Sequence, residues 1–180
     1  IFFEFAKLEP IREEDDYNNF RAYFTAHYGK IANEMKIDIT TGDEITPGAV
    51  EYSYSTILDG DEIKVMAYNK ETIIAEKYET IIRRNIGTTR ARDFYDLYMF
   101  FKLYKDDIDY DILKLALKRT SDKRGSTELM AEWQGICFDM RGDPGLESLW
   151  DNYQRNNRYA EKITFEMIMD TVETVGEKMK

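Results

Sequence analysis

AEKYETIIRRNIGTTRARDFYDLY, residues Ala75–Tyr98, is the stretch from which we interpret the whole chain. It is dense in charges and aromatic side chains, and it joins two segments in which apolar residues recur with the spacing of a helix. We therefore predict one helix over Lys70–Arg84 and a second over Arg90–Tyr104, with Gly87 in the break between them. Functional side chains are expected to concentrate in this stretch.

Lys77 lies at the edge of the apolar face that the first helix is expected to bury, beside Ile73 and Ile81. Two interpretations fit this position. The lysine could lay its aliphatic stem along the core and keep its amine in water, or it could direct a cation at a phosphate. Spacing alone favours the first.

Asp93 and Asp96 are three residues apart at the start of the second helix, so they occupy neighbouring positions on its surface. Arg92 can reach Asp96 across one turn. An ordinary ion pair at the beginning of a helix would explain all three residues, and the pattern by itself assigns them no function.

The N-terminal part of the chain is rich in strand signals. Ile1–Glu9 and Phe20–Tyr28 are predicted to form a hairpin around a long loop, in which the acidic run Glu13–Asp16 is expected to be a solvated turn and not a metal cluster. Further strands are predicted over Met35–Thr40 and Glu62–Tyr68, separated by a polar connection. Alternation places His27 on the polar side of its strand, in a surface or cross-strand role.

Asp38 alternates with Ile37 and Ile39 in the predicted third strand. Because successive side chains point to opposite faces of a sheet, the two isoleucines are expected to be buried and Asp38 to project from the other face. A strand aspartate of this kind is more often a cross-strand partner than a catalyst.

Helices are predicted for most of the remaining chain, which is typical of an α+β protein with a small mixed or antiparallel sheet followed by a C-terminal helical bundle. The sequence favours a division into a β-rich region, residues 1–68, and a helical region, residues 69–180. The expected helices cover Tyr110–Arg119, Thr127–Phe138, Leu146–Asn156 and Phe165–Met179, with a basic corner at Lys118–Arg124 and a break at Arg141–Gly145.

Composition restricts the chemistry available to the chain. Hydrophobic residues make up 43% of its 180 residues, which is enough for a core, so the 33% of charged residues is interpreted as a solvated surface. One cysteine and one histidine leave only carboxylates to hold a metal. The net charge of −10 argues against general nucleic-acid binding. Because no apolar run reaches 18 residues, we expect a soluble, cytoplasmic protein with no membrane partner.

Three ordered blocks, IDITTGDEITPG (37–48), AEKYETIIRR (75–84) and RARDFYDLYMFFK (90–102), resemble the AbiEii/AbiGii-type toxins. The similarity extends to LWDNYQRNNRYAEKITFEMI (149–168). This family is nucleotidyltransferase-like, within the DNA polymerase β superfold, and occurs in type IV toxin–antitoxin and phage abortive-infection systems. The resemblance implies that residues 1–68 are a β-rich remnant of a nucleotidyltransferase core, and that the first helices after residue 69 complete it.

The resemblance also implies roles for individual residues. Asp38 matches an acidic position beside the metal site and is expected to be a base or a ligand of Mg²⁺, and Lys77 matches a lysine that contacts the nucleoside triphosphate. Asp93 matches a catalytic aspartate, with Arg92 and Asp96 as nucleotide-binding neighbours. Divalent metals held by carboxylates and a lysine on the triphosphate are what nucleotidyl transfer requires.

The first motif of the family, a glycine turn followed by an Asp-x-Asp pair, has no counterpart in this sequence. Because the chain opens on Ile1 in a strand-like run, we expect residues upstream. The implied function is transfer of a nucleotide from a nucleoside triphosphate to tRNA or a protein, provided that an upstream segment or a partner supplies the pair. The alternative is a truncated or degenerate fold that binds a nucleotide or a cognate antitoxin without catalysis.

Overall fold

The computed structural model describes residues 1–11, 19–57 and 59–180, so the acidic run Glu13–Asp16 lies outside the described residues. The chain divides into two compact units, Ile1–Asp43 and Glu44–Lys180. Five strands and seven α-helices occur in the described part, all the strands preceding the helices, and the expected α+β class is confirmed. The predicted domain division between residues 68 and 69 stays a prediction.

The first unit is an antiparallel sheet in the order β1-β2-β3, built from Phe2–Pro10, Phe20–Tyr28 and Ile31–Ile39. The predicted hairpin of the first two strands is confirmed. A two-residue turn joins β2 to β3, and Gly29 takes its φ of +59°, which a residue without Cβ adopts at little cost. His27 Nε2 lies 3.2 Å from Glu4 Oε2 on the neighbouring strand, in the cross-strand role expected for it.

The expectation that the strand face opposite Asp38 is buried is wrong. Ile37 is 50% exposed and Ile39 is 42% exposed, because the described residues of the first unit supply no second layer that covers either face of the sheet. The third strand also begins earlier than predicted, at Ile31, since every residue of β2 finds a pairing partner there.

A second hairpin, β4 (Val50–Ser55) with β5 (Glu62–Ala67), forms within the second unit. The sequence predicted only the second strand of this hairpin. It treated the residues of the first strand as a polar connection, which is wrong. Tyr52 pairs with Val65 and Tyr54 with Ile63, so one face of β4 is carried by tyrosines while serines occupy the other. Aromatic residues suit strands, but alternating serine masks the pattern.

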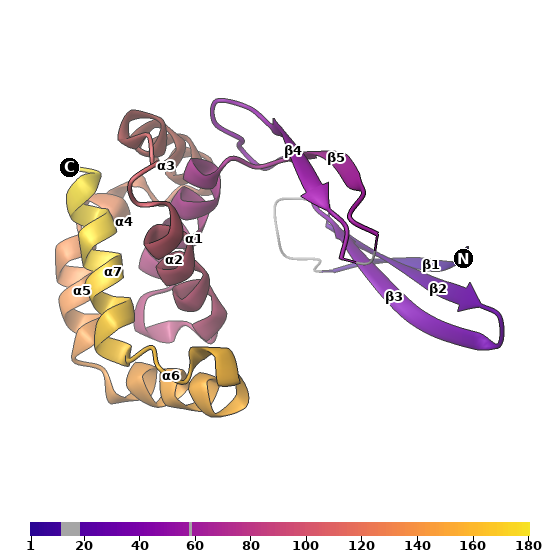
Figure 1. Cartoon of the computed structure of the whole chain (residues 1–180). Helices are drawn as coiled ribbons and strands as arrows, with labels where there is room; N and C mark the ends of the chain where they lie inside the picture. The colour runs from indigo at the N-terminus through magenta and orange to yellow at the C-terminus, as the bar shows by residue number, and fades with distance from the viewer. Residues whose placement is uncertain (12–18, 58) are drawn as a thin grey trace. The chain divides into compact units, whose positions relative to one another are not determined.

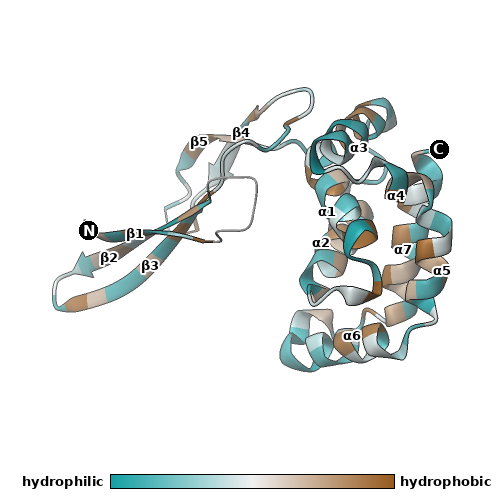
Figure 2. Ribbon diagram, turned by 180° about the vertical axis from the view of Figure 1, so that it is seen from behind, coloured by the Kyte–Doolittle hydropathy of each residue, from teal (hydrophilic) through white to brown (hydrophobic). Residues whose placement is uncertain are grey.

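The helices of the second unit bury a single apolar cluster, in which Tyr78, Ile82, Leu97 and Met169 have almost no exposed surface. Helix α1 packs on α2 and α3, while α7 packs along α2 and α5 (Figure 1). Hydrophobic and hydrophilic positions alternate along these helices in Figure 2, as expected for amphipathic helices around a shared core. The helices are α1 (Lys70–Arg84), α2 (Ala91–Tyr104), α3 (Tyr110–Arg124), α4 (Thr127–Ala131), α5 (Trp133–Arg141), α6 (Pro144–Asn156) and α7 (Phe165–Lys178), with 3₁₀ turns at Asn85–Gly87 and Arg158–Ala160.

The start of α1 is capped by the side chain of Asn69. Asn69 Oδ1 accepts a hydrogen bond from Thr72 N at 2.9 Å, and Asn69 Nδ2 donates to Thr46 O at 2.7 Å. These bonds fasten the preceding loop to the helix that carries Lys77.

Several helix boundaries differ from those expected, and α6 begins at Pro144, within the predicted break. Helix α3 continues through the predicted basic corner to Arg124 and ends at Gly125, whose φ of +63° is left-handed. The single helix expected over Thr127–Phe138 is two helices that meet at Glu132. None of the helices in residues 1–11, 19–57 and 59–180 has both the length and the apolar character of a membrane span.

Candidate functional site

Lys77 emerges from the edge of the buried face of α1, where the sequence placed it. Its neighbours on that face, Ile74, Tyr78 and Ile81, are completely or almost completely buried, whereas the Lys77 side chain keeps 26% of its surface exposed. The stem therefore packs against the core and the amine reaches the surface of α2.

Asp93 is in the first turn of α2 and is only 3% exposed. It belongs to the buried side of the helix that also carries Phe94 and Leu97. A carboxylate at this depth requires cationic or hydrogen-bonding partners, because burial removes its hydration. The helix N-terminus also favours a negative charge at this position.

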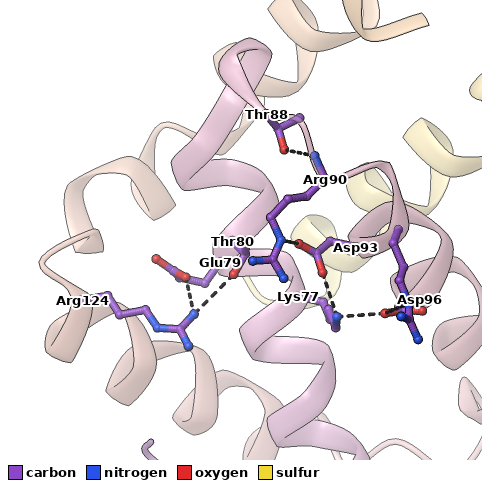
Figure 3. A network of polar contacts seen from close by, with 9 residues as sticks. Lys77, Glu79, Thr80, Thr88, Arg90, Asp93, Asp96 and Arg124 are labelled. Carbon is purple, nitrogen blue, oxygen red and sulfur yellow. Dashed lines mark hydrogen bonds and ion pairs between the residues drawn. The ribbon is translucent and has the colours of Figure 1, made fainter. Parts of the chain in front are cut away.

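Two cations hold Asp93, one from each side (Figure 3). Lys77 Nζ donates to Asp93 Oδ1 at 2.7 Å and to Asp96 Oδ2 at 2.9 Å. Arg90 Nε donates to Asp93 Oδ2 at 2.6 Å. The amine of Lys77 thus joins the two aspartates that the sequence placed three residues apart.

Arg92 and Arg90 have different places in this cluster. The predicted pair of Arg92 with Asp96 is present, but its nitrogen–oxygen distance is 3.8 Å and the arginine is 80% exposed. Arg90, which the sequence analysis did not single out, makes the shorter contact. The spacing of three residues between Arg90 and Asp93 is a signal that could have identified it.

The ionisation of Lys77 follows from these contacts. Burial by itself would lower its pKa, but the hydrogen bonds from the amine to Asp93 and Asp96 outweigh burial and raise the pKa above its usual value. The amine is therefore a cation at neutral pH. Three basic side chains, Lys77, Arg90 and Arg92, face two acidic ones, so the cluster carries one net positive charge.

This cluster lines one wall of a groove of about 560 Å³. The opposite wall comes from α6 and the residue that follows it, and it presents Asn152, Tyr153, Asn156 and Asn157. The groove is in the size range of small-molecule sites. The sequence analysis missed the α6 wall, since these residues are about 60 positions from α2 and carry no charge.

Asp38 belongs to the first unit and has its own cation. Arg21 lies opposite it in the β2–β3 register, and donates from Nε to Oδ1 at 2.6 Å and from Nη2 to Oδ2 at 2.8 Å. These bonds hold the pKa of Asp38 below its usual range. The catalytic role that the family resemblance implies for Asp38, together with Lys77 and Asp93, stays a prediction.

The carboxylates do not fit a Mg²⁺ site as they are placed. Both oxygens of Asp38 accept from Arg21, and those of Asp93 accept from Lys77 and Arg90. Within the described part of the chain, no group of three or more histidine, cysteine, aspartate or glutamate side chains is close enough to hold a metal. The metal-binding role of Asp38 stays a prediction.

A second buried carboxylate, Glu79, serves the fold. It has no exposed surface, and its oxygens accept from Arg83 Nε at 2.7 Å, Arg124 Nη1 at 2.7 Å and Ser126 Oγ at 2.8 Å. Figure 3 shows the contact with Arg124. Arg124 ends α3 and Ser126 precedes α4, so Glu79 fastens α1 to the corner between them.

Comparison with known proteins assigns this arrangement to a class. The model of a family described as "Nucleotidyl transferase AbiEii toxin, Type IV TA system" matches residues 2–173, which places the chain in the class of nucleotidyltransferase-like toxins of type IV toxin–antitoxin systems. The chain belongs to the AbiEii family, as its three sequence blocks indicated. No curated protein and no solved structure matches it.

Proposed function

We propose that the chain binds a nucleoside triphosphate in the groove between α2 and α6, and that it serves in transferring the nucleotide to an RNA or protein acceptor, with tRNA as the RNA. The observation that carries this proposal is the Lys77 amine, charged and half-buried on the groove wall between Asp93 and Asp96. In its family context the reaction would disable a cytoplasmic acceptor, and so act as a toxin against the cell or an infecting phage.

The cluster suits a polyphosphate for electrostatic reasons. Its net positive charge attracts an anion, and the exposed Arg92 can turn toward a phosphate at little cost, since its contact with Asp96 is long. Lys77 is held in place before the ligand arrives, so little side-chain entropy is lost on binding. Mg²⁺ would accompany the triphosphate as its counterion and would neutralise part of the phosphate charge.

In the proposed transfer a hydroxyl oxygen of the acceptor attacks the α-phosphorus. A new phosphorus–oxygen bond forms, the bond to the bridging oxygen of the β-phosphate breaks, and pyrophosphate leaves with the electron pair. The proton of the hydroxyl passes to a carboxylate, for which Asp38 and Asp93 are the predicted residues. Lys77 stabilises the negative charge that develops on the phosphates.

The direct test incubates the protein with each of four α-³²P nucleoside triphosphates and with tRNA or cell protein. We expect label to appear in one acceptor and to fall at least tenfold in Lys77→Ala. Lys114→Ala removes an exposed lysine of α3 and is the matched control. Absence of transfer from all four triphosphates to either acceptor would refute the enzymatic proposal.

A second candidate is a module that binds a nucleotide or a cognate antitoxin without catalysis. It is favoured by the pairing of Asp38 with Arg21 and of Asp93 with Lys77 and Arg90, because those carboxylates already neutralise cations. The net charge of −10 would suit a basic antitoxin. Triphosphate binding without transfer, together with a complex with the antitoxin on size exclusion at moderate salt, would support this candidate.

A further inference from the structure

The α6 wall of the groove differs in chemistry from the wall that carries Lys77. Asn152 and Asn156 are one helical turn apart on α6, so their amides share a face, and Tyr153 lies beside them. One wall is therefore charged, and the facing wall offers amides and a phenol.

Tyr153 is held in place by aromatic neighbours. Its ring stacks on Trp150 with centroids 5.3 Å apart, and it lies 6.0 Å from the ring of Tyr95. Its hydroxyl is 3.1 Å from that of Tyr159. Burial and the hydrogen bond with Tyr159 raise the pKa of Tyr153, so the phenol stays neutral. The ring is a rigid surface on the groove wall.

The two asparagines retain hydrogen-bonding capacity. Asn156 Nδ2 donates to the backbone oxygen of Asn152 at 2.9 Å and, more weakly, to Asn152 Oδ1 at 3.3 Å. For residues 1–11, 19–57 and 59–180, the structure gives neither Asn152 Nδ2 nor Asn156 Oδ1 a partner. One donor and one acceptor therefore remain for a ligand in the groove.

The two parts of a nucleotide correspond in chemistry to the two walls of the groove. Its phosphates carry the charge, and its base is a neutral aromatic ring whose edge presents donors and acceptors. Bases stack on aromatic side chains, and asparagine amides pair with base edges. We infer that the α6 wall, through Asn152, Asn156 and Tyr153, binds and selects the base of the nucleoside triphosphate, an inference that rests on the proposed function.

The same chemistry could serve a base of an RNA acceptor, but the groove favours the triphosphate. Its volume of about 560 Å³ suits one small molecule, and the two walls bound the same groove. A phosphate held at Lys77 would bring its own base to the facing wall.

The test measures equilibrium binding of the four nucleoside triphosphates, of tRNA, and of inorganic tripolyphosphate, which has no base. It compares the wild-type chain with the double variant Asn152→Ala/Asn156→Ala. Ser148→Ala, one turn earlier on α6 and outside the groove lining, is the control. Lys77→Ala tests the phosphate wall, and circular dichroism verifies that each variant is folded.

We expect the wild type to prefer one base by about tenfold and the double variant to lose most of that preference. Tripolyphosphate should bind both proteins with affinities within about twofold, since each of them keeps Lys77. The Ser148→Ala control should behave as the wild type.

Four results would overturn the inference. They are a wild type without base preference, a double variant that keeps the preference, a double variant that loses tripolyphosphate as strongly as nucleotides, and a double variant that loses only RNA binding. In each case the triphosphate site at Lys77 could stand. Failure of the wild type to bind either a nucleoside triphosphate or tripolyphosphate would refute the proposed function together with this inference.

Discussion

Lys77 Nζ lies 2.7 Å from Asp93 Oδ1 and so joins the first two helices of the second unit by a partly buried ion pair. The same amine reaches Asp96 at 2.9 Å. The lysine thus serves the fold as well as the proposed site, because it supplies one of the two cations that hold a carboxylate away from water.

Replacing Lys77 by methionine should therefore reduce stability as well as nucleotide binding. Asp93 would keep Arg90 but lose its shared bond with Lys77, and we expect the free energy of unfolding to fall by about 1–3 kcal/mol. Urea denaturation followed by circular dichroism measures the change. Lys114→Met, at an exposed site on α3, should change it by less than about 0.5 kcal/mol. Equal effects of the two substitutions would contradict a structural role for Lys77.

The ion pair of Asp38 with Arg21 should make the stability of the protein depend on pH. Hydrogen bonds from Arg21 lower the pKa of Asp38 in the folded chain, so the stability that this pair contributes is present above the ordinary aspartate pKa of about 3.9. It is lost as the pH falls through the lower, folded-state value. Carboxyl NMR titration should show Asp38 protonating below its usual range, and Arg21→Gln should restore ordinary titration. Identical curves for the two proteins would exclude the pair in solution.

Local periodicity predicted the elements that carry the cluster. The buried stripe of α1 and the stripe of α2 through Phe94 and Leu97 follow from apolar spacing, and this placed Lys77 at the correct edge. Asp93, expected on the helix surface, is buried instead. Arg90 was missed because it stands at the first position of the predicted helix, where apolar spacing gives no sign of its ion pair with Asp93.

Other features depend on partners distant in the sequence. The face with Ile37 and Ile39 is exposed because burial depends on a second layer, which the alternation of a strand cannot predict. The α6 wall of the groove forms only when helices far apart along the chain pack together. Neutral asparagines give no signal of such a site in the sequence. The family resemblance supplied roles for residues that geometry alone would assign to ion pairs.

Replacing Glu79 should reduce the stability of the fold. In Glu79→Gln the two guanidinium groups of Arg83 and Arg124 would face a neutral amide in a buried position, and we expect a loss of about 3 kcal/mol in the free energy of unfolding. The exposed Glu128 on α4 provides the control, and Glu128→Gln should be close to neutral. Thermal unfolding followed by circular dichroism compares them. A Glu79→Gln protein as stable as the wild type would refute the anchoring role.

Gly176 lies where α7 packs closely against Tyr78 and Trp133. A Cβ added there would lie 2.6 Å from the hydroxyl oxygen of Tyr78 and 2.7 Å from a ring carbon of Trp133, closer than side chains can approach. Tyr78 is fully buried, so it cannot move aside without disturbing α1. We expect Gly176→Ala to reduce the free energy of unfolding by about 1–3 kcal/mol.

Gly135 supplies the matched control for Gly176. It too lies within a helix, α5, but an added Cβ would meet no atom within 4 Å. Gly135→Ala should therefore be neutral or stabilising by up to about 1 kcal/mol, because alanine favours the helix. Urea unfolding of both variants separates crowding from helix propensity. Stabilisation of the protein by both alanines would show that α7 does not pack against Tyr78 and Trp133 as closely as the structure places it.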